Sequence, residues 1–331
     1  MNISKILVPN KPQMDPITAV FLLGEYGEEK FPGITNAKIC YWKYSHDPNS
    51  DEIKQMESEG IIFVDIGGGK FDHHGTKECA SSLVAKYLGI ENKPELSALL
   101  SYVREDDLAG LHNRFGDLAY TLKAMYKLGI PSNKVVEYAL QTINLLQEGQ
   151  KDWHVKVRDE FEKKCKIFNT KRNNRKIKIG VIETDDAQVG NYGITVKNMA
   201  LMLIKRSTGH AFILTNKLHR IDLRELVGAL RKREMELRGY EKELDPVKLR
   251  FEGKNQMIPY WFFHRSLNAI MNGSESLNKT EPTVIPFEEK IRFVMYAVSS
   301  DYSNLCDCHE GGQNCPYRRY GFKKCLDNRR K

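Results

Sequence analysis

A short window in the first quarter of the chain gathers residue types that bind divalent metal ions. Asp65 ends an apolar run, three glycines follow, and Asp72, His73 and His74 come next. Hard cations such as Mg²⁺ take carboxylate oxygens, and Mn²⁺ also accepts imidazole nitrogen. The alternative is that the aspartates are turn residues and the histidines are satisfied by hydrogen bonds. Because clustered carboxylates without a cation are costly, we expect a metal site.

The elements around this window predict a parallel sheet. Residues 3–8, 37–43 and 60–66 are short apolar runs typical of buried strands, and residues 16–24 have helical character. Strands that alternate with helices favour a parallel α/β sheet, which binds ligands beyond the carboxyl ends of its strands. Asp65 lies at such an end, and Asp15 follows the first strand, so both side chains can reach one crevice.

The remaining chain predicts a helical extension and a second domain. Residues 80–168 show successive helical periodicities, and the basic segment 171–176 has no apolar face, so we place a linker there. The fold class is α/β: a parallel-sheet catalytic lobe with a helical extension over residues 1–170, then a second, smaller α/β lobe over 175–300. Within that lobe we expect helices at 194–204 and 222–237 and strands at 177–182 and 211–214.

The sequence from Val64 to His74 resembles the linked second and third motifs of the DHH phosphoesterase superfamily. This superfamily includes RecJ-like nucleases, oligonucleotide and cyclic-dinucleotide phosphodiesterases, and pyrophosphatases. The resemblance is closest to the melanocyte-proliferating-gene branch, in which a glycine-containing turn joins the two motifs as it does here. The resemblance implies that Asp65 bridges two Mn²⁺ ions and that His73 ligates one of them. It implies that Asp72 and His74 hold the site and face the scissile phosphate.

Two further positions of the family pattern leave alternatives open. The family has an aspartate ligand at the end of a downstream helix, for which Asp106 and Asp107 fit equally well. Its first motif has a histidine or a pair of aspartates after the first strand, where this chain has Gln13 and Asp15. Only Asp15 matches, because glutamine is a weak neutral oxygen ligand. The site therefore holds a single ion, recruits His46 or Asp47, or keeps binding without activity.

The predicted function follows from this chemistry. Bound ions acidify water and neutralise phosphoryl oxygens, and His74 is placed to move a proton to the leaving oxygen. We expect a divalent-metal-dependent phosphodiesterase or nuclease, of the exonuclease type, that hydrolyses RNA, DNA or short oligonucleotides with Mn²⁺ or Mg²⁺ in the catalytic cleft. The alternatives are a catalytically weakened nucleic-acid or nucleotide-binding module and a hydrolase of small nucleotides or pyrophosphate.

The second lobe lacks the family's Gly-Gly-Gly-His signature, so its candidates rest on residue types. They are cations, histidines and small polar residues at turns or on a basic helix, which suit phosphates and stacked bases. The alternatives are a solvated helix face for the arginines and strand packing for the aromatic residues. The candidate substrate-binding residues are His210, Arg224, His264, Arg265, Asn272 and Gly273.

The C-terminal tail, residues 301–331, is basic and concentrates thiols. Four cysteines and a histidine lie within it: Cys306, Cys308, His309, Cys315 and Cys325. Four soft ligands predict a structural Zn²⁺, which would supply the folding energy that a polar tail lacks. The alternative is a pair of disulfides or free thiols in a basic end that binds nucleic acid loosely.

Composition limits the class of protein. The 331 residues carry a net charge of +8, which favours an anionic partner such as nucleic acid or an oligonucleotide. The sequence contains no apolar run long enough for a membrane span and no secretory signal at its start, so we expect a cytoplasmic protein without a membrane partner. Oligomeric state is not predictable from these features.

Overall fold

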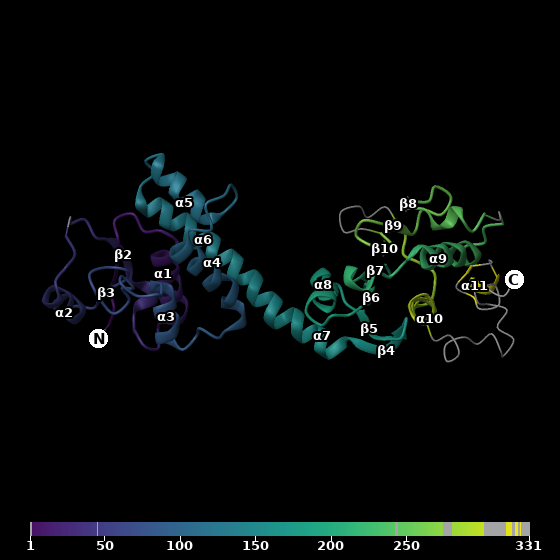
Figure 1. Cartoon of the computed structure of the whole chain (residues 1–331), viewed down its shortest axis with the longest axis horizontal. Coiled ribbons are helices and arrows are strands. Elements are labelled where there is room, and N and C mark those ends of the chain that lie inside the picture. Colours follow the sequence, from purple (N-terminus) through teal and green to yellow (C-terminus); the bar gives the residue numbers. More distant parts are fainter. Residues whose placement is uncertain are drawn as a thin grey trace. The chain divides into compact units, whose positions relative to one another are not determined.

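The structure is a computed structural model that describes residues 2–44, 46–241, 244–273, 280–300, 316–319, 322–323 and 325. The chain is a mixed α/β protein in two compact units, Met1–His154 and Val155–Lys331 (Figure 1). Among the described residues, none of the helices has the length and apolar character needed to cross a membrane.

The N-terminal unit is built on a three-stranded parallel sheet. Its strands are β1 (Lys5–Val8), β2 (Lys38–Tyr41) and β3 (Ile61–Phe63), in the order β2-β1-β3. Helix α1 (Met14–Tyr26) follows β1, and α2 (Ser50–Ser58) precedes β3. Ten consecutive residues of α1 are buried, because other elements cover it on all sides. The predicted parallel sheet is confirmed.

Successive helices form the rest of this unit, as the periodicity predicts. They are α3 (Ala80–Leu88), α4 (Ser97–Ala109), α5 (Leu118–Lys127) and α6 (Ser132–Lys151), with short 3-10 turns η1 (Ile34–Asn36) and η2 (Pro94–Leu96). Helices α3, α4 and α6 pack against α1. Their apolar faces share one core with β1 and β3, which fixes the helix ends that carry the acidic residues.

The boundary between the units differs from the predicted linker. Helix α6 passes directly into a π-helical segment, η3 (Asp152–Val157), and then into α7 (Arg158–Lys164), and the units divide inside η3. Residues 171–176 are instead the tip of a hairpin between β4 (Lys166–Arg172) and β5 (Arg175–Glu183). Asn173 and Asn174 form its turn with φ of 48° and 62°. A polar, basic hairpin tip has the same composition as a linker, which explains the difference.

The C-terminal unit contains a seven-stranded mixed sheet in the order β4-β5-β6-β7-β10-β9-β8. Its other strands are β6 (Leu201–Lys205), β7 (Ala211–Thr215), β8 (Gly253–Lys254), β9 (Phe262–His264) and β10 (Ala269–Met271). Helix α8 (Ala187–Thr195) joins the parallel pair β5 and β6, and the other described pairs are antiparallel. The predicted helix at 194–204 is wrong, because Leu201–Ile204 is a strand with every residue buried.

Helices and short turns cover this sheet. They are α9 (Arg224–Leu237), α10 (Phe287–Val298) and α11 (Pro316–Arg319), with 3-10 turns η4 (Lys217–His219) and η5 (Lys248–Arg250). Helix α9 packs against η5, α10 and α11. Apolar residues of α9, α10 and the central strands form the core of this unit.

A buried arginine fixes the segment that follows α9. The side chain of Arg231 is 1 % exposed, and its guanidinium donates to the carbonyls of Leu249, Phe251, Gly253 and Trp261. Burial lowers the pKa of Arg231 to about 10. Arg231 is therefore buried in the unit, whereas Arg224, seven residues earlier in the chain, is exposed. Arg231 serves the fold.

Candidate metal centre

A glycine turn after β3 brings the acidic and histidine residues together. Asp65 has a left-handed backbone with φ of 59°, and its amide donates to the carbonyl of Phe71 at 3.0 Å. Gly67 and Gly68 also have positive φ, of 64° and 71°, which glycine adopts without steric cost. The chain therefore makes a tight loop, closed by a parallel bridge between Val64 and Phe71, and places Asp72 and His73 next to Asp65.

The imidazole of His73 is the point on which three carboxylates converge. Its Nε2 atom lies 3.1 Å from Asp65 Oδ1, 3.7 Å from Asp15 Oδ2 and 3.7 Å from Asp107 Oδ2. These aspartates come from three different places: the end of β3, the first turn of α1 and the last turn of α4. The set of one imidazole and three carboxylates matches the ligands of Mn²⁺ or Mg²⁺ sites.

Asp15 is held in place by the start of helix α3. Its Oδ2 accepts a hydrogen bond from the amide of Ala80 at 2.7 Å, and its Oδ1 accepts two from Ser81, at 2.8 Å from the amide and 2.6 Å from the hydroxyl. The carboxylate is 2 % exposed. A carboxylate oxygen can accept more than one bond, so Oδ2 retains capacity on the side of His73.

The carboxylates carry more negative charge than their protein partners neutralise. Asp65 Oδ1 is buried and accepts no hydrogen bond from the described residues. Burial, and then repulsion from Asp15, raises the pKa of Asp65 to about 7, and the same two causes raise the pKa of Asp107. A cation would satisfy the orphaned oxygen and relieve the repulsion. The residues present therefore fit a divalent ion.

Asp72 and His74 form a pair beside this cluster. Asp72 Oδ1 lies 2.5 Å from His74 Nδ1, and Asp72 also accepts from the amides of Gly68 and His74. Burial raises the pKa of Asp72, but these hydrogen bonds outweigh it, so the pKa is lowered overall. The bond to Asp72 raises the pKa of His74. With Nδ1 engaged, His74 presents Nε2 from a side chain that is 71 % exposed.

The structure separates the two aspartates that the sequence could not. Asp107 faces His73, whereas Asp106 is buried on another face of α4 and lies 3.5 Å from Lys123 Nζ. Gln13 precedes α1, is exposed, and does not cap the helix with its side chain. His46 is also exposed, and its backbone carbonyl accepts a hydrogen bond from Trp42.

Three of the candidates in the C-terminal unit hold loops together. His210 bonds to Thr208 Oγ1 at 2.8 Å and to the carbonyl of Thr280 at 2.9 Å. Asn272 is fully buried, and among the described residues its side chain bonds to the backbone of Tyr260, Glu281 and Thr283. Gly273 has φ of +85°, and a Cβ there would lie 2.7 Å from the ring of His210. These contacts give His210, Asn272 and Gly273 structural roles in the fold.

The other three candidates are more exposed. Arg224 makes a bidentate ion pair with Asp222, and His264 Nδ1 lies 3.1 Å from Ser266 Oγ. Arg265 lines a pocket together with Arg224. The neighbouring pocket residues Arg250 and Phe251 were missed by the sequence analysis. They lie far from Arg224 and Arg265 in sequence, and the fold alone joins them.

The predicted zinc ligands fall mostly outside the described residues. Cys306, Cys308, His309 and Cys315 are not among them. Cys325 is described, is 6 % exposed, and belongs to the apolar core of the C-terminal unit as a free cysteine. The zinc site stays a prediction.

Comparison with known proteins gives little that is specific. No protein-family model matches the chain, and no curated protein matches it. Among solved structures, an uncharacterized protein from Helicobacter pylori G27 is 10 % identical, with 89 % of this chain and 99 % of that chain covered, at a TM-score of 0.23. A putative family II inorganic pyrophosphatase from Methanococcus jannaschii is 13 % identical, with 67 % of this chain and 73 % of that chain covered, at a TM-score of 0.14. At such low scores the function must be argued from the site itself.

Proposed function

We propose that the N-terminal unit is a divalent-metal-dependent phosphoesterase. The observation that carries the proposal is the convergence of Asp15, Asp65 and Asp107 on His73 Nε2, with one buried carboxylate oxygen of Asp65 that has no hydrogen-bond donor among the described residues. We assign the ligand roles to these four residues. A bound Mn²⁺ or Mg²⁺ would neutralise charge on phosphoryl oxygens and acidify an attacking water.

The Asp72 and His74 pair supplies the proton chemistry in this proposal. The 2.5 Å contact with Asp72 fixes the His74 ring and favours a proton on Nδ1. With Nδ1 bonded to Asp72, the exposed Nε2 is the atom from which protonated His74 can donate to a leaving oxygen. Asp72 therefore acts as the positioning residue and His74 as the general acid.

We further propose a phosphodiester in RNA, DNA or a short oligonucleotide as the substrate. The net charge of +8 supports a polyanionic partner. Pyrophosphate and small nucleotides offer the same phosphoryl group to the metal ion, so they belong in the same test. We also expect cleavage from a strand end, as by an exonuclease. The products of the end-labelled strands in the test below distinguish this mode from internal cleavage.

Binding without turnover is the second candidate function, and the observation that favours it is Gln13. Its exposed amide stands where the resembled family has a ligand, which leaves the first motif with Asp15 alone. The carboxylate of Asp15 in turn accepts three hydrogen bonds from the start of α3. A centre with fewer ligands would bind a phosphate yet activate water poorly.

The test compares two adjacent aspartates. Mn²⁺ binding is measured by loss of the free-ion EPR signal, and turnover is measured on end-labelled single-stranded RNA and DNA, a cyclic dinucleotide and pyrophosphate. Asp107→Asn removes a carboxylate that faces His73, whereas Asp106→Asn changes one that faces Lys123. We expect Asp107→Asn to weaken Mn²⁺ binding at least about tenfold and to abolish turnover, with Asp106→Asn close to the unmodified protein.

Each outcome decides between the candidates. Turnover that depends on Mn²⁺ and on Asp107 supports the phosphoesterase and identifies its substrate. Mn²⁺ binding that depends on Asp107, without turnover of any substrate, supports the binding function. Equal Mn²⁺ binding by both variants would contradict the metal centre itself.

A further inference from the structure

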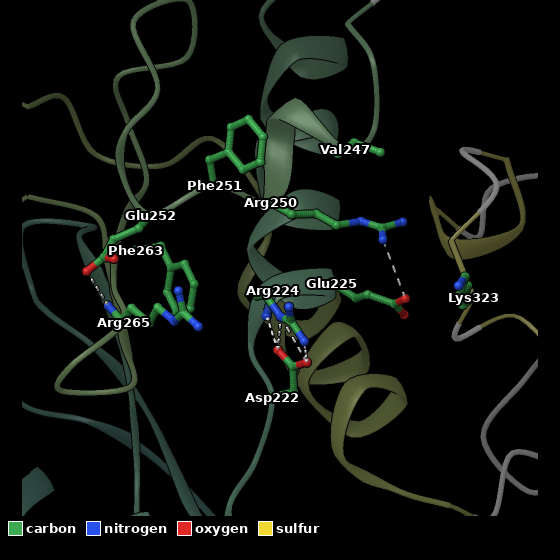
Figure 2. Close-up of a pocket in the computed structure, with 10 residues that line it drawn as sticks. All are labelled: Asp222, Arg224, Glu225, Val247, Arg250, Phe251, Glu252, Phe263, Arg265 and Lys323. Atoms are coloured by element: carbon green, nitrogen blue, oxygen red, sulfur yellow. Dashed lines mark hydrogen bonds and ion pairs between the residues drawn. The ribbon is translucent and has the colours of Figure 1, made fainter.

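A second candidate site lies in the C-terminal unit, in a pocket at the start of α9. The pocket encloses about 500 Å³, a size typical of small-molecule sites. Its walls come from the first turn of α9, from the segment after η5 and from the turn after β9 (Figure 2). Cations and carboxylates both line it: Arg224, Arg250, Arg265 and Lys323, and Asp222, Glu225 and Glu252.

The three arginines differ in how fully their charge is neutralised. Arg224 is already engaged by both oxygens of Asp222. The backbone amide of Arg265 donates to Glu252 at 3.2 Å and its carbonyl accepts from Asn268, whereas its guanidinium makes no ion pair within the described part of the chain. Figure 2 shows this guanidinium extending from the β9 side toward Arg224. Arg265 is therefore the cation most available to an anionic ligand.

Arg250 and Glu225 form an incomplete pair across the same pocket. Their closest nitrogen and oxygen atoms are 3.9 Å apart, which is beyond hydrogen-bond distance. Arg250 Nε and Glu225 Oε2 are buried and have no hydrogen-bond partner among the described residues. Unsatisfied polar groups of this kind call for an explanation. The two side chains keep exposed fractions of 23 % and 18 %, so a ligand with an acceptor for Arg250 and a donor for Glu225 could still contact the pair.

An exposed aromatic ring stands beside these charges. The Phe251 side chain is 61 % exposed and lines the pocket next to Arg250. A nucleobase would cover this ring, and its amino or imino groups are donors that a carboxylate accepts, while its phosphate suits a guanidinium. Inorganic phosphate would satisfy only the arginines, and a nucleoside only the ring and the carboxylates.

We propose that this pocket binds one nucleoside monophosphate unit, with the phosphate at Arg265 and the base against Phe251. A free nucleotide and the terminal nucleotide of a strand present the same chemistry. The pocket lies within the C-terminal unit, so this inference does not rest on the metal centre of the N-terminal unit.

The experiment uses the full chain in EDTA, so that failure of the metal centre leaves the result unaffected. Calorimetry measures the dissociation constants of AMP, GMP, CMP and UMP, of adenosine, of inorganic phosphate and of the dinucleotide pApA. We expect at least one mononucleotide to bind about tenfold or more tightly than adenosine and phosphate. Tight binding of pApA would assign a strand terminus, and its exclusion would assign a free nucleotide.

Two exposed positions separate the contributions. Arg265→Gln should raise the dissociation constant of the mononucleotide about tenfold and leave adenosine unchanged. Phe251→Ala should weaken the mononucleotide and adenosine but not phosphate. Lys217→Gln, an exposed charge loss on η4 away from the pocket, is the matched control. Phosphate that binds as tightly as the mononucleotide, absence of binding, or variants equal to the control would overturn the proposal.

Discussion

Asp15 illustrates how one side chain serves the fold and the candidate site together. Its three hydrogen bonds to Ala80 and Ser81 place a negative charge at the start of α3, where unpaired amides and the helix dipole favour it. The same carboxylate faces His73. The position of the metal centre is thus set by a helix start as well as by the glycine turn.

Lys290 gives a prediction that concerns stability alone. Burial lowers its pKa from an ordinary 10.5 to about 8, and its Nζ donates to the carbonyl of Ile285. Between pH 8 and 10.5 the unfolded chain binds more protons at this group, so its effect is to raise the free energy of unfolding with pH. We expect a contribution on the order of 2–3 kcal/mol across this window.

The check is urea denaturation from pH 7.5 to 10.5 with Lys290→Met and, as control, Lys217→Met. In Lys290→Met the free energy of unfolding should lose the increase with pH that Lys290 contributes. In the exposed control Lys217→Met it should keep this increase. If the two variants show parallel pH profiles, the buried ammonium is not the cause.

At the scale of elements, the glycine turn after β3 offers two neighbouring positions with different surroundings. Both Gly67 and Gly68 have positive φ, but a Cβ on Gly67 would lie 2.7 Å from Pro48, whereas one on Gly68 meets nothing within 4 Å. Alanine in a left-handed conformation costs about 1 kcal/mol at either position. Only at Gly67 must the turn also move.

We therefore expect Gly67→Ala to weaken Mn²⁺ binding about tenfold, since ligands displaced by a fraction of an ångström lose their geometry. Gly68→Ala should change Mn²⁺ binding much less. EPR titration of the two variants measures the difference, and circular dichroism checks that both fold. Equal losses would mean that backbone strain, rather than the contact with Pro48, controls the turn.

The elements also show how far sequence patterns reach. Short apolar runs predicted the three parallel strands. The short spacing between Asp65 and His73 predicted that these two side chains lie together. The choice between Asp106 and Asp107 could not be made, because successive helical residues point about 100° apart and only packing fixes which one faces the site. Residues 201–204 were assigned to a helix because a strand buried on both faces has no alternation to reveal it.

At the scale of the whole molecule, each unit has its own apolar core. We expect two thermal transitions in calorimetry of the full chain, each responding to one ligand. Mn²⁺ at a hundredfold excess over its dissociation constant should raise one transition by roughly 5–10 °C, and a mononucleotide should raise the other.

Asp107→Asn should abolish the shift caused by Mn²⁺ and preserve the shift caused by the mononucleotide, and Arg265→Gln should do the reverse. A single transition that both ligands raise would show instead that the units unfold cooperatively.

The buried guanidinium of Arg231 has a consequence for motion. It holds the carbonyls of Leu249, Phe251 and Gly253, which flank Arg250 and Glu252 in the wall of the C-terminal pocket. Backbone tied at three points over five residues has little conformational freedom left to lose when a ligand arrives. Association at this wall should therefore carry a small entropic penalty.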